Sequence, residues 1–189
     1  MFDTLLSKNT IKILFIRFFT LLTRFLFIIF FAKSYSLEIV GIYGLIHAVT
    51  IISSQIIPFE FHNYVTLEIL ANKPGNRKKI ISNSLFFLSI SFIFLIPLFS
   101  FLFQYTTIGD SYFLYVIFLI IFETLSREFE RIFIGLSKPT AKYVSIFLKS
   151  FPWMFTVLIL VFNNTFIKFE AILSLWIVST FLATVYGLI

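Results

Sequence analysis

Residues 11–32 read IKILFIRFFTLLTRFLFIIFFA, an apolar run that is long enough to cross a bilayer as one helix. Arg17 and Arg24 interrupt this run seven positions apart, so on a helix they share one face to within about 20°, with Thr20 between them. An arginine near mid-bilayer costs roughly 2.5–3.5 kcal/mol, and such cations usually face a bundle interior or a watery cavity. We therefore expect Arg17, Thr20 and Arg24 to line a polar cavity. The alternative is that the arginines extend to the inner interface or pair with carboxylates on neighbouring helices.

The composition is that of an integral membrane protein. Of 189 residues, 59% are hydrophobic and 13% are charged, whereas soluble domains have about 45–50% and 25%. The chain has no cysteine, which excludes disulfides and thiolate metal sites, and His47 and His62 have no metal-ligand spacing, so we expect no metal or other cofactor. The net charge of +6 does not indicate nucleic-acid binding, because the basic residues cluster in short connections between apolar runs.

Six segments are apolar and long enough to span a bilayer core of about 30 Å. They cover approximately residues 11–33, 37–58, 80–103, 111–135, 140–162 and 167–188. The sequence therefore predicts an all-α fold, a polytopic membrane helix bundle with six transmembrane helices in a single domain over 1–189. The connections are too short to hold a catalytic domain and contain no phosphate-binding glycine loop, so we do not expect an enzyme.

Residues 59–71, FEFHNYVTLEILA, follow Pro58 and are too polar to span a membrane. One interpretation is a short helix along the membrane surface. In such a helix the side chains that face the lipid would be Phe59, Val65, Leu67 and Ile69. The other interpretation is an ordinary cytoplasmic loop.

The distribution of lysine and arginine orients the predicted spans. Ten basic residues fall in the N-terminal region and in the second and fourth connections: Lys8, Lys12, Lys73, Arg77, Lys78, Lys79, Arg127, Arg131, Lys138 and Lys142. The first and fifth connections contribute only Lys33 and Lys168, and the third contributes none. Because cytoplasmic loops carry the excess of positive charge, we expect both ends of the chain to be cytoplasmic.

The second predicted span carries two sets of small or polar residues. One set has the spacing that lets helices approach closely in lipid: Gly41, Gly44 and Ala48. The other set shares one helix face: His47, Thr50 and Ser54. This polar face is either a cavity wall or a surface for hydrogen bonds between helices.

Charged residues also lie within the fourth and fifth predicted spans. Glu123, Arg127 and Arg131 step by four along the fourth, a spacing that favours pairing of Glu123 with Arg127. Glu123 is near mid-membrane and needs a cation, which Arg24 or Lys149 could supply. We expect Glu128, Glu130 and Arg131 to form a solvated or salt-bridged face near the cytoplasm. Lys149 lies beside Pro152, which indicates a bend there.

Two segments carry a resemblance to a known family: GIYGLIHAV at 41–49 and ETLSREFERIFIGLSKPTAKYVSIFLKSFPW at 123–153. In spacing and character they resemble the N-terminal half of oligosaccharide flippases of the polysaccharide transporter family, which includes the O-antigen flippases. The resemblance implies a location in the bacterial inner membrane. It also implies transport of undecaprenyl-pyrophosphate-linked oligosaccharides for surface polysaccharide or lipopolysaccharide synthesis. Arg17 and Arg24 would then meet the diphosphate, and Lys149 would join them.

The same resemblance implies one lobe of a two-lobe transporter that rocks around a central cavity. The second lobe is expected either in a further part of the chain or in a partner subunit. Two other functions stay open: a lobe of a multidrug exporter from the same superfamily, and a membrane subunit or remnant that does not transport. A cavity for cationic drugs should be net acidic, and Arg17, Arg24 and Lys149 outnumber Glu123.

Overall fold

The computed structural model describes residues 8–59, 61–72, 74–103, 110–163, 165 and 167–188. Over these residues it contains helices and turns but no strand, which confirms the all-α class. The helices of the described chain are α1 (Lys8–Ser34), α2 (Leu37–Ile56), α3 (Phe61–Ala71), α4 (Pro74–Phe103), α5 (Asp110–Gly135), α6 (Pro139–Phe162) and α7 (Phe169–Leu188).

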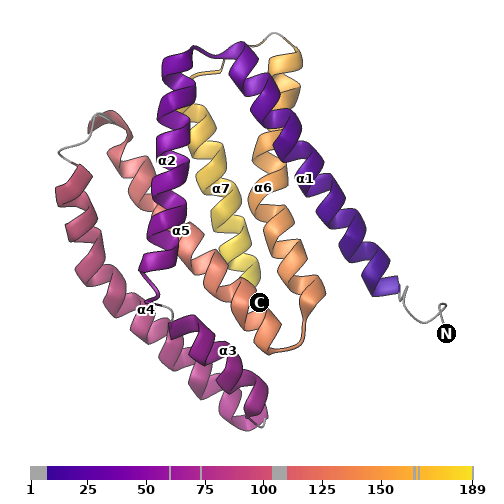
Figure 1. The fold of residues 1–189 in the computed structure, drawn as a ribbon, viewed down its shortest axis with the longest axis vertical. Helices are drawn as coiled ribbons and strands as arrows, with labels where there is room; N and C mark the ends of the chain where they lie inside the picture. Colours follow the sequence, from indigo (N-terminus) through magenta and orange to yellow (C-terminus); the bar gives the residue numbers. More distant parts are fainter. Residues whose placement is uncertain are drawn as a thin grey trace.

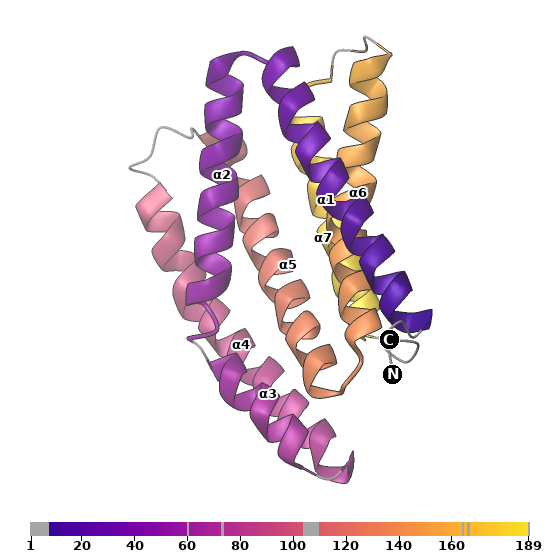
Figure 2. The same cartoon turned by 45° about the vertical axis from the view of Figure 1, so that its right-hand side comes forward.

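The long helices run alternately up and down the molecule (Figure 1). The start of α1, the turn between α5 and α6, and the end of α7 therefore lie at the same end as the short helix α3 (Figures 1 and 2). Helix α6 lies between α1 and α7, and α7 also packs against α5. The main core forms where these helices meet α2, around the fully buried side chains of Phe27, Ile46, Leu119, Trp153 and Ile172.

Local sequence signals explain where the helices begin and end. Ser36 caps α2 by accepting a hydrogen bond from the backbone N–H of Ile39 at 3.4 Å. Helix α5 ends in a Schellman motif, in which Ser137 takes a positive φ of 58° and Lys138 N–H donates to the carbonyl of Phe133 at 2.8 Å. Pro139 then occupies the first turn of α6, where its missing N–H costs nothing. These signals fix short turns between long helices.

Four of the described helices are long and apolar enough to cross a membrane: α1 from Thr10 onward, α2, α6 and α7. This is the composition of a membrane-embedded helix bundle. Helix α5 is not among the four, because Glu123 and Arg127 through Arg131 place five charges in its second half. In α4, several side chains after residue 94 lie outside the described part of the chain. Of the six predicted spans, the described residues therefore support four.

Residues 61–71 form helix α3, as the first interpretation of this segment predicts. Phe59 and Leu67 are exposed, as expected for lipid-facing residues. The prediction is wrong for Val65 and Ile69, which are 2% and 0% exposed because they pack against α5. An eleven-residue helix with apolar residues on both sides gives no sequence signal for which side meets the bundle.

The expected close packing at the small residues of α2 is also wrong for the described structure. A Cβ atom added at Gly41 or Gly44 would have no heavy atom within 4 Å, and Ala48 is exposed. Helix α2 instead packs through the face that carries Ile46 and Thr50. Close approaches occur instead at Gly187 of α7, where an added Cβ would overlap the Phe129 side chain, and at Gly135 of α5, where it would lie 3.1 Å from the Ile69 side chain.

Candidate functional site

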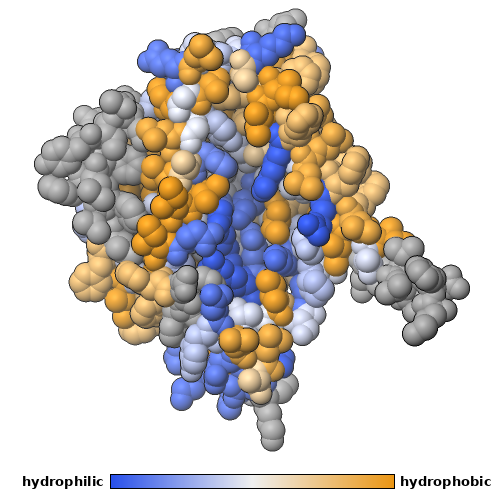
Figure 3. Space-filling model, viewed as in Figure 1, coloured by the Kyte–Doolittle hydropathy of each residue, from blue (hydrophilic) through white to orange (hydrophobic). Residues whose placement is uncertain are grey.

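A cavity of about 540 Å³ opens on one face of the bundle. Helices α1, α2, α5, α6 and α7 all contribute to its wall. Its polar lining residues are Arg24, His47, Glu123, Arg127, Glu130, Arg131, Lys142, Lys149 and Ser150. In Figure 3 a blue, hydrophilic strip runs down the middle of this face between orange, hydrophobic flanks. A polar interior between apolar flanks is the pattern expected of a cavity inside a membrane.

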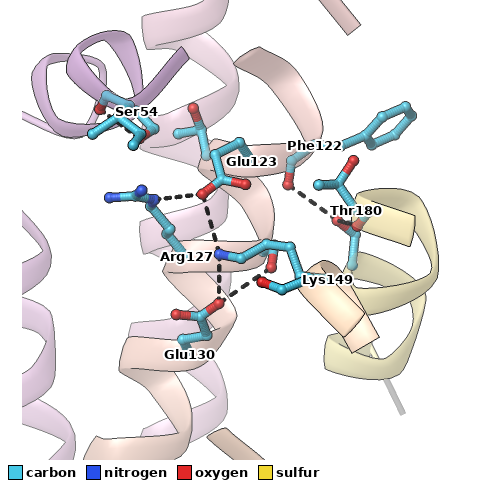
Figure 4. A network of polar contacts seen from close by, with 12 residues as sticks. Ser54, Phe122, Glu123, Arg127, Glu130, Lys149 and Thr180 are labelled. Carbon is cyan, nitrogen blue, oxygen red and sulfur yellow. Dashed lines mark hydrogen bonds and ion pairs between the residues drawn. The ribbon is translucent and has the colours of Figure 1, made fainter. Parts of the chain in front are cut away.

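A four-residue ionic network joins α5 to α6 along the cavity wall. The Lys149 ammonium lies 2.7 Å from a Glu130 carboxylate oxygen and 3.2 Å from Glu123 Oε1. Arg127 Nε donates to the same Glu123 oxygen at 2.8 Å. Figure 4 shows Lys149 between the two carboxylates, with Arg127 approaching Glu123 from the other side. Two cations and two carboxylates therefore neutralise each other, and both predicted partners of Glu123 on α5 and α6 reach it.

A second polar group connects α5 to α2 and α4 at the end that carries the α5–α6 turn. Arg131 donates to the Gln55 side chain at 3.1 Å and lies 3.7 Å from Glu128 Oε2. Ser84 of α4 donates to the other Glu128 oxygen at 2.7 Å. Glu128 is 3% exposed, so of the two predicted forms of this face, the salt-bridged form is correct.

Arg24 differs from the other arginines of the cavity. One terminal nitrogen donates to the Ser150 hydroxyl at 2.6 Å, and its Nε atom is buried without a hydrogen-bond partner. Among the described residues, Arg24 has no carboxylate within 4.0 Å. The predicted alternative, pairing of Arg24 with a carboxylate, is thus not what the described chain shows. Arg24 contributes a positive charge that no carboxylate of the described residues neutralises in an ion pair.

The charges of the lining add up to a cationic cavity. Five lysines and arginines face two carboxylates, a formal excess of three positive charges. Glu128 lies behind the lining and offsets Arg131, so the uncompensated cations are Arg24 and Lys142. In a low-dielectric site an uncompensated cation attracts anions strongly. The cavity therefore suits a ligand that carries negative charge.

Aromatic rings form the other end of the cavity wall. The lining includes Tyr43, His47, Trp153 and Trp176. The His47 ring lies 5.7 Å from Trp176, and the two tryptophan rings are stacked at 5.4 Å. His47 is thus part of a cavity wall. Thr50 and Ser54 do not add a hydrogen bond between helices, because Ser54 donates within α2 and the Thr50 hydroxyl has no partner.

The arginine stripe of α1 divides between two environments. Arg24 lines the cavity, but Arg17 and Thr20 do not. The exposed Arg17 guanidinium lies 5.4 Å from the centre of the Tyr143 ring, and Thr20 is buried with its hydroxyl donating to the Ile16 carbonyl at 2.8 Å. In the described structure the predicted cavity position therefore holds for Arg24 alone.

Four further residues of the lining were not among the predicted site residues: Tyr43, Ser150, Trp153 and Trp176. For Trp153 a signal was present, because Lys142, Lys149 and Trp153 follow one another at helical spacing along one face of α6. Tyr43 and Trp176 reach the cavity through packing between helices that are distant in sequence.

Comparisons with protein families, with curated proteins and with solved structures gave no significant match to this chain. The residues of the cavity are therefore the basis for assigning a function.

Proposed function

We propose that this protein is one lobe of a transporter that moves undecaprenyl-pyrophosphate-linked oligosaccharides across the bacterial inner membrane. The observation that carries the proposal is the state of Arg24. It lines a cavity at membrane depth, it has no carboxylate partner among the described residues, and its Nε is buried without an acceptor. A guanidinium in that state needs an anionic ligand with several oxygen acceptors, which a diphosphate provides.

The surrounding wall supports an anion site rather than a general polar cavity. Lys149 and Arg127 are held by Glu123 and Glu130, so they give the wall its shape without adding net charge. Lys142 adds a second uncompensated cation four residues into α6. A diphosphate entering from the end of the α5–α6 turn would meet Lys142 first and Arg24 deeper in the bundle.

The proposed topology follows from the charges and the alternation of the helices. With α4 and α5 included as spans, the chain crosses the membrane six times and the N-terminus is cytoplasmic. The ten basic residues of the cytoplasmic segments would then lie at the end that carries α3 and the α5–α6 turn. Since Lys142 is at that end, the cavity would accept its ligand from the cytoplasmic leaflet.

A second lobe completes the proposal. Charged groups such as Arg24 and Glu130 cannot face hydrocarbon without a large desolvation cost, so the open side of the cavity requires a facing wall. A second helical lobe, from further sequence or from a partner subunit, would supply it. An exporter of cationic drugs is less consistent with this wall, because its lining has an excess of positive charge.

The test is the surface polysaccharide of a bacterial strain that depends on the protein. We expect Arg24→Ala to abolish surface polysaccharide at normal protein levels, and Arg24→Lys to retain part of it, because lysine keeps the charge but loses the planar fork. Arg17→Ala is the matched control from the same helix and should retain most of the polysaccharide. Normal polysaccharide in the Arg24→Ala strain would refute the anion-binding role, and with it the proposed function.

A further inference from the structure

Helix α3 lies outside the bundle of long helices but is firmly attached to it. In both views α3 runs beside the start of α4 at the end of the molecule that carries the α5–α6 turn (Figures 1 and 2). Val65 and Ile69 are buried against Phe129 and Ile132 of α5. An added Cβ at Gly135 would lie 3.1 Å from the Ile69 side chain, so the two helices are in close contact. This packing fixes which face of α3 points away from the protein.

The outward face of α3 is mainly apolar although the helix is not a span, and Asn63 is an exposed polar residue on it. Tyr64, Leu67 and Leu70 repeat every third residue and are 58%, 68% and 48% exposed. The one charged residue of the helix, Glu68, accepts a hydrogen bond from the Asn72 side chain at 2.7 Å and is only partly exposed. Phe59, just before the helix, is 61% exposed. A helix with one protein-facing side and one uncharged, mainly apolar outer side is suited to a membrane interface.

Basic residues follow α3 in the first turns of α4. Arg77 Nε donates to the Asn72 carbonyl at 3.2 Å, which joins the end of α3 to the start of α4. Lys78 and Lys79 follow and are exposed, and within the described residues neither has an ion pair with a carboxylate. Figure 3 shows orange atoms bordered by blue ones at this lower end of the molecule.

We propose that α3 and the first turns of α4 form a surface anchor that binds acidic phospholipid headgroups. Leu67 and Leu70 enter the headgroup–acyl boundary, and Lys78 and Lys79 bind the lipid phosphates beside them. Juxtamembrane basic residues are attracted to anionic leaflets in this way. A second copy of this chain would bring the same basic residues against Lys78 and Lys79, and the like charges would repel, so the bilayer is the better match to this surface. The inference does not depend on what the cavity transports.

The absence of cysteine from the chain makes a direct test simple. A spin label is attached to Leu67→Cys, and the full chain is reconstituted into vesicles of phosphatidylcholine alone or of phosphatidylcholine with phosphatidylglycerol. Collision rates with oxygen, which enters lipid, and with a water-soluble nickel chelate give the depth of the label. We expect the label at 67 to be in lipid, about 5–10 Å below the headgroup level, and deeper with phosphatidylglycerol. The double variant Lys78→Gln/Lys79→Gln should lose this lipid dependence.

Two labelled positions bracket the measurement. Ser137→Cys, exposed in the α5–α6 turn, should report water, and Leu21→Cys, 61% exposed on α1, should report hydrocarbon. A label at 67 with the nickel accessibility of the label at 137 would overturn the anchor. A label at 67 shielded from both reagents would show a protein partner and would also overturn it. A depth that ignores phosphatidylglycerol or the two lysines would overturn the binding of acidic headgroups.

Discussion

The two walls of the cavity differ in whether their cations are paired with carboxylates. On the α5–α6 wall, Arg127 and Lys149 are each within 3.2 Å of a carboxylate, and the four charges cancel. On the α1 wall, Arg24 donates to the Ser150 hydroxyl, has no carboxylate within 4.0 Å among the described residues, and has one buried nitrogen without a hydrogen-bond partner. The cations of the α5–α6 wall are therefore paired with carboxylates, whereas the cation of the α1 wall is not.

This difference separates a structural role from a ligand-binding role. A buried ion pair is satisfied within the protein, and breaking it leaves an uncompensated charge in a low-dielectric site. Arg24 is partly buried and has no carboxylate within 4.0 Å among the described residues, so removing it leaves no opposite charge uncompensated. In the proposed function its counter-ion is the ligand. The first kind of residue should therefore control stability, and the second kind should control binding.

The largest expected effect is on stability and comes from Lys149→Met. The substitution leaves Glu130 without a cation and Glu123 with Arg127 alone. The side chains of Lys149, Glu123 and Glu130 are each at most 12% exposed. We expect a loss of about 3–5 kcal/mol in the free energy of unfolding, measured by chemical unfolding in detergent micelles. The double variant Lys149→Met/Glu130→Gln is the control, because it removes one charge of each sign and should recover much of the loss. Equal stability of Lys149→Met and wild type would break the comparison between the walls.

The second expected effect is on binding and comes from Arg24→Ala. Hydrogen bonds to charged groups contribute about 1.5–3 kcal/mol, so affinity for undecaprenyl diphosphate should fall roughly ten- to a hundredfold. Binding to the purified protein in lipid nanodiscs measures this, with Arg24→Lys as the variant that keeps the charge. Stability should fall by less than in Lys149→Met, since the bond to Ser150 contributes about 1.5–3 kcal/mol and the removal of a cation without a carboxylate partner offsets part of that loss. A stability loss as large as that of Lys149→Met would place Arg24 with the structural residues.

The helices were predictable because each depends on a local pattern. Apolar runs of sufficient length, separated by Pro139 or by the polar residues around Ser36, give all six long helices to within a few residues, except that α4 begins at Pro74 rather than near residue 80. That difference arises because charged residues 77–79 are poor in a span but acceptable in a helix. The outer face of α3 and the packing face of α2 were not predictable, because they depend on which neighbour each helix meets.

The candidate site was predictable only in part, for the same reason. The Glu123–Arg127 pair follows from a spacing of four within one helix, and Lys149 was one of two cations expected to reach Glu123. The contact of Lys149 with Glu130 depends on the register of α6 against α5. The separation of Arg17 from Arg24 depends on where α1 leaves the cavity. Neither is encoded in any short stretch of sequence.

The smallest expected effect comes from Arg17→Ala and tests that separation. Arg17 shares a helix face with Arg24 but lies outside the cavity lining, where its guanidinium is exposed and 5.4 Å from the Tyr143 ring centre. An exposed cation–π contact contributes about 0.5–1 kcal/mol to stability, so the same unfolding measurement should register only a slight loss. Tyr143→Leu is the matched control, because it removes the other half of the contact. Affinity for undecaprenyl diphosphate should change less than about threefold, since the charge is outside the cavity and screened. If Arg17→Ala weakened binding as much as Arg24→Ala, both arginines of α1 would bind the ligand. The presence or absence of a carboxylate partner would then not separate the residues that stabilise the protein from those that bind the ligand.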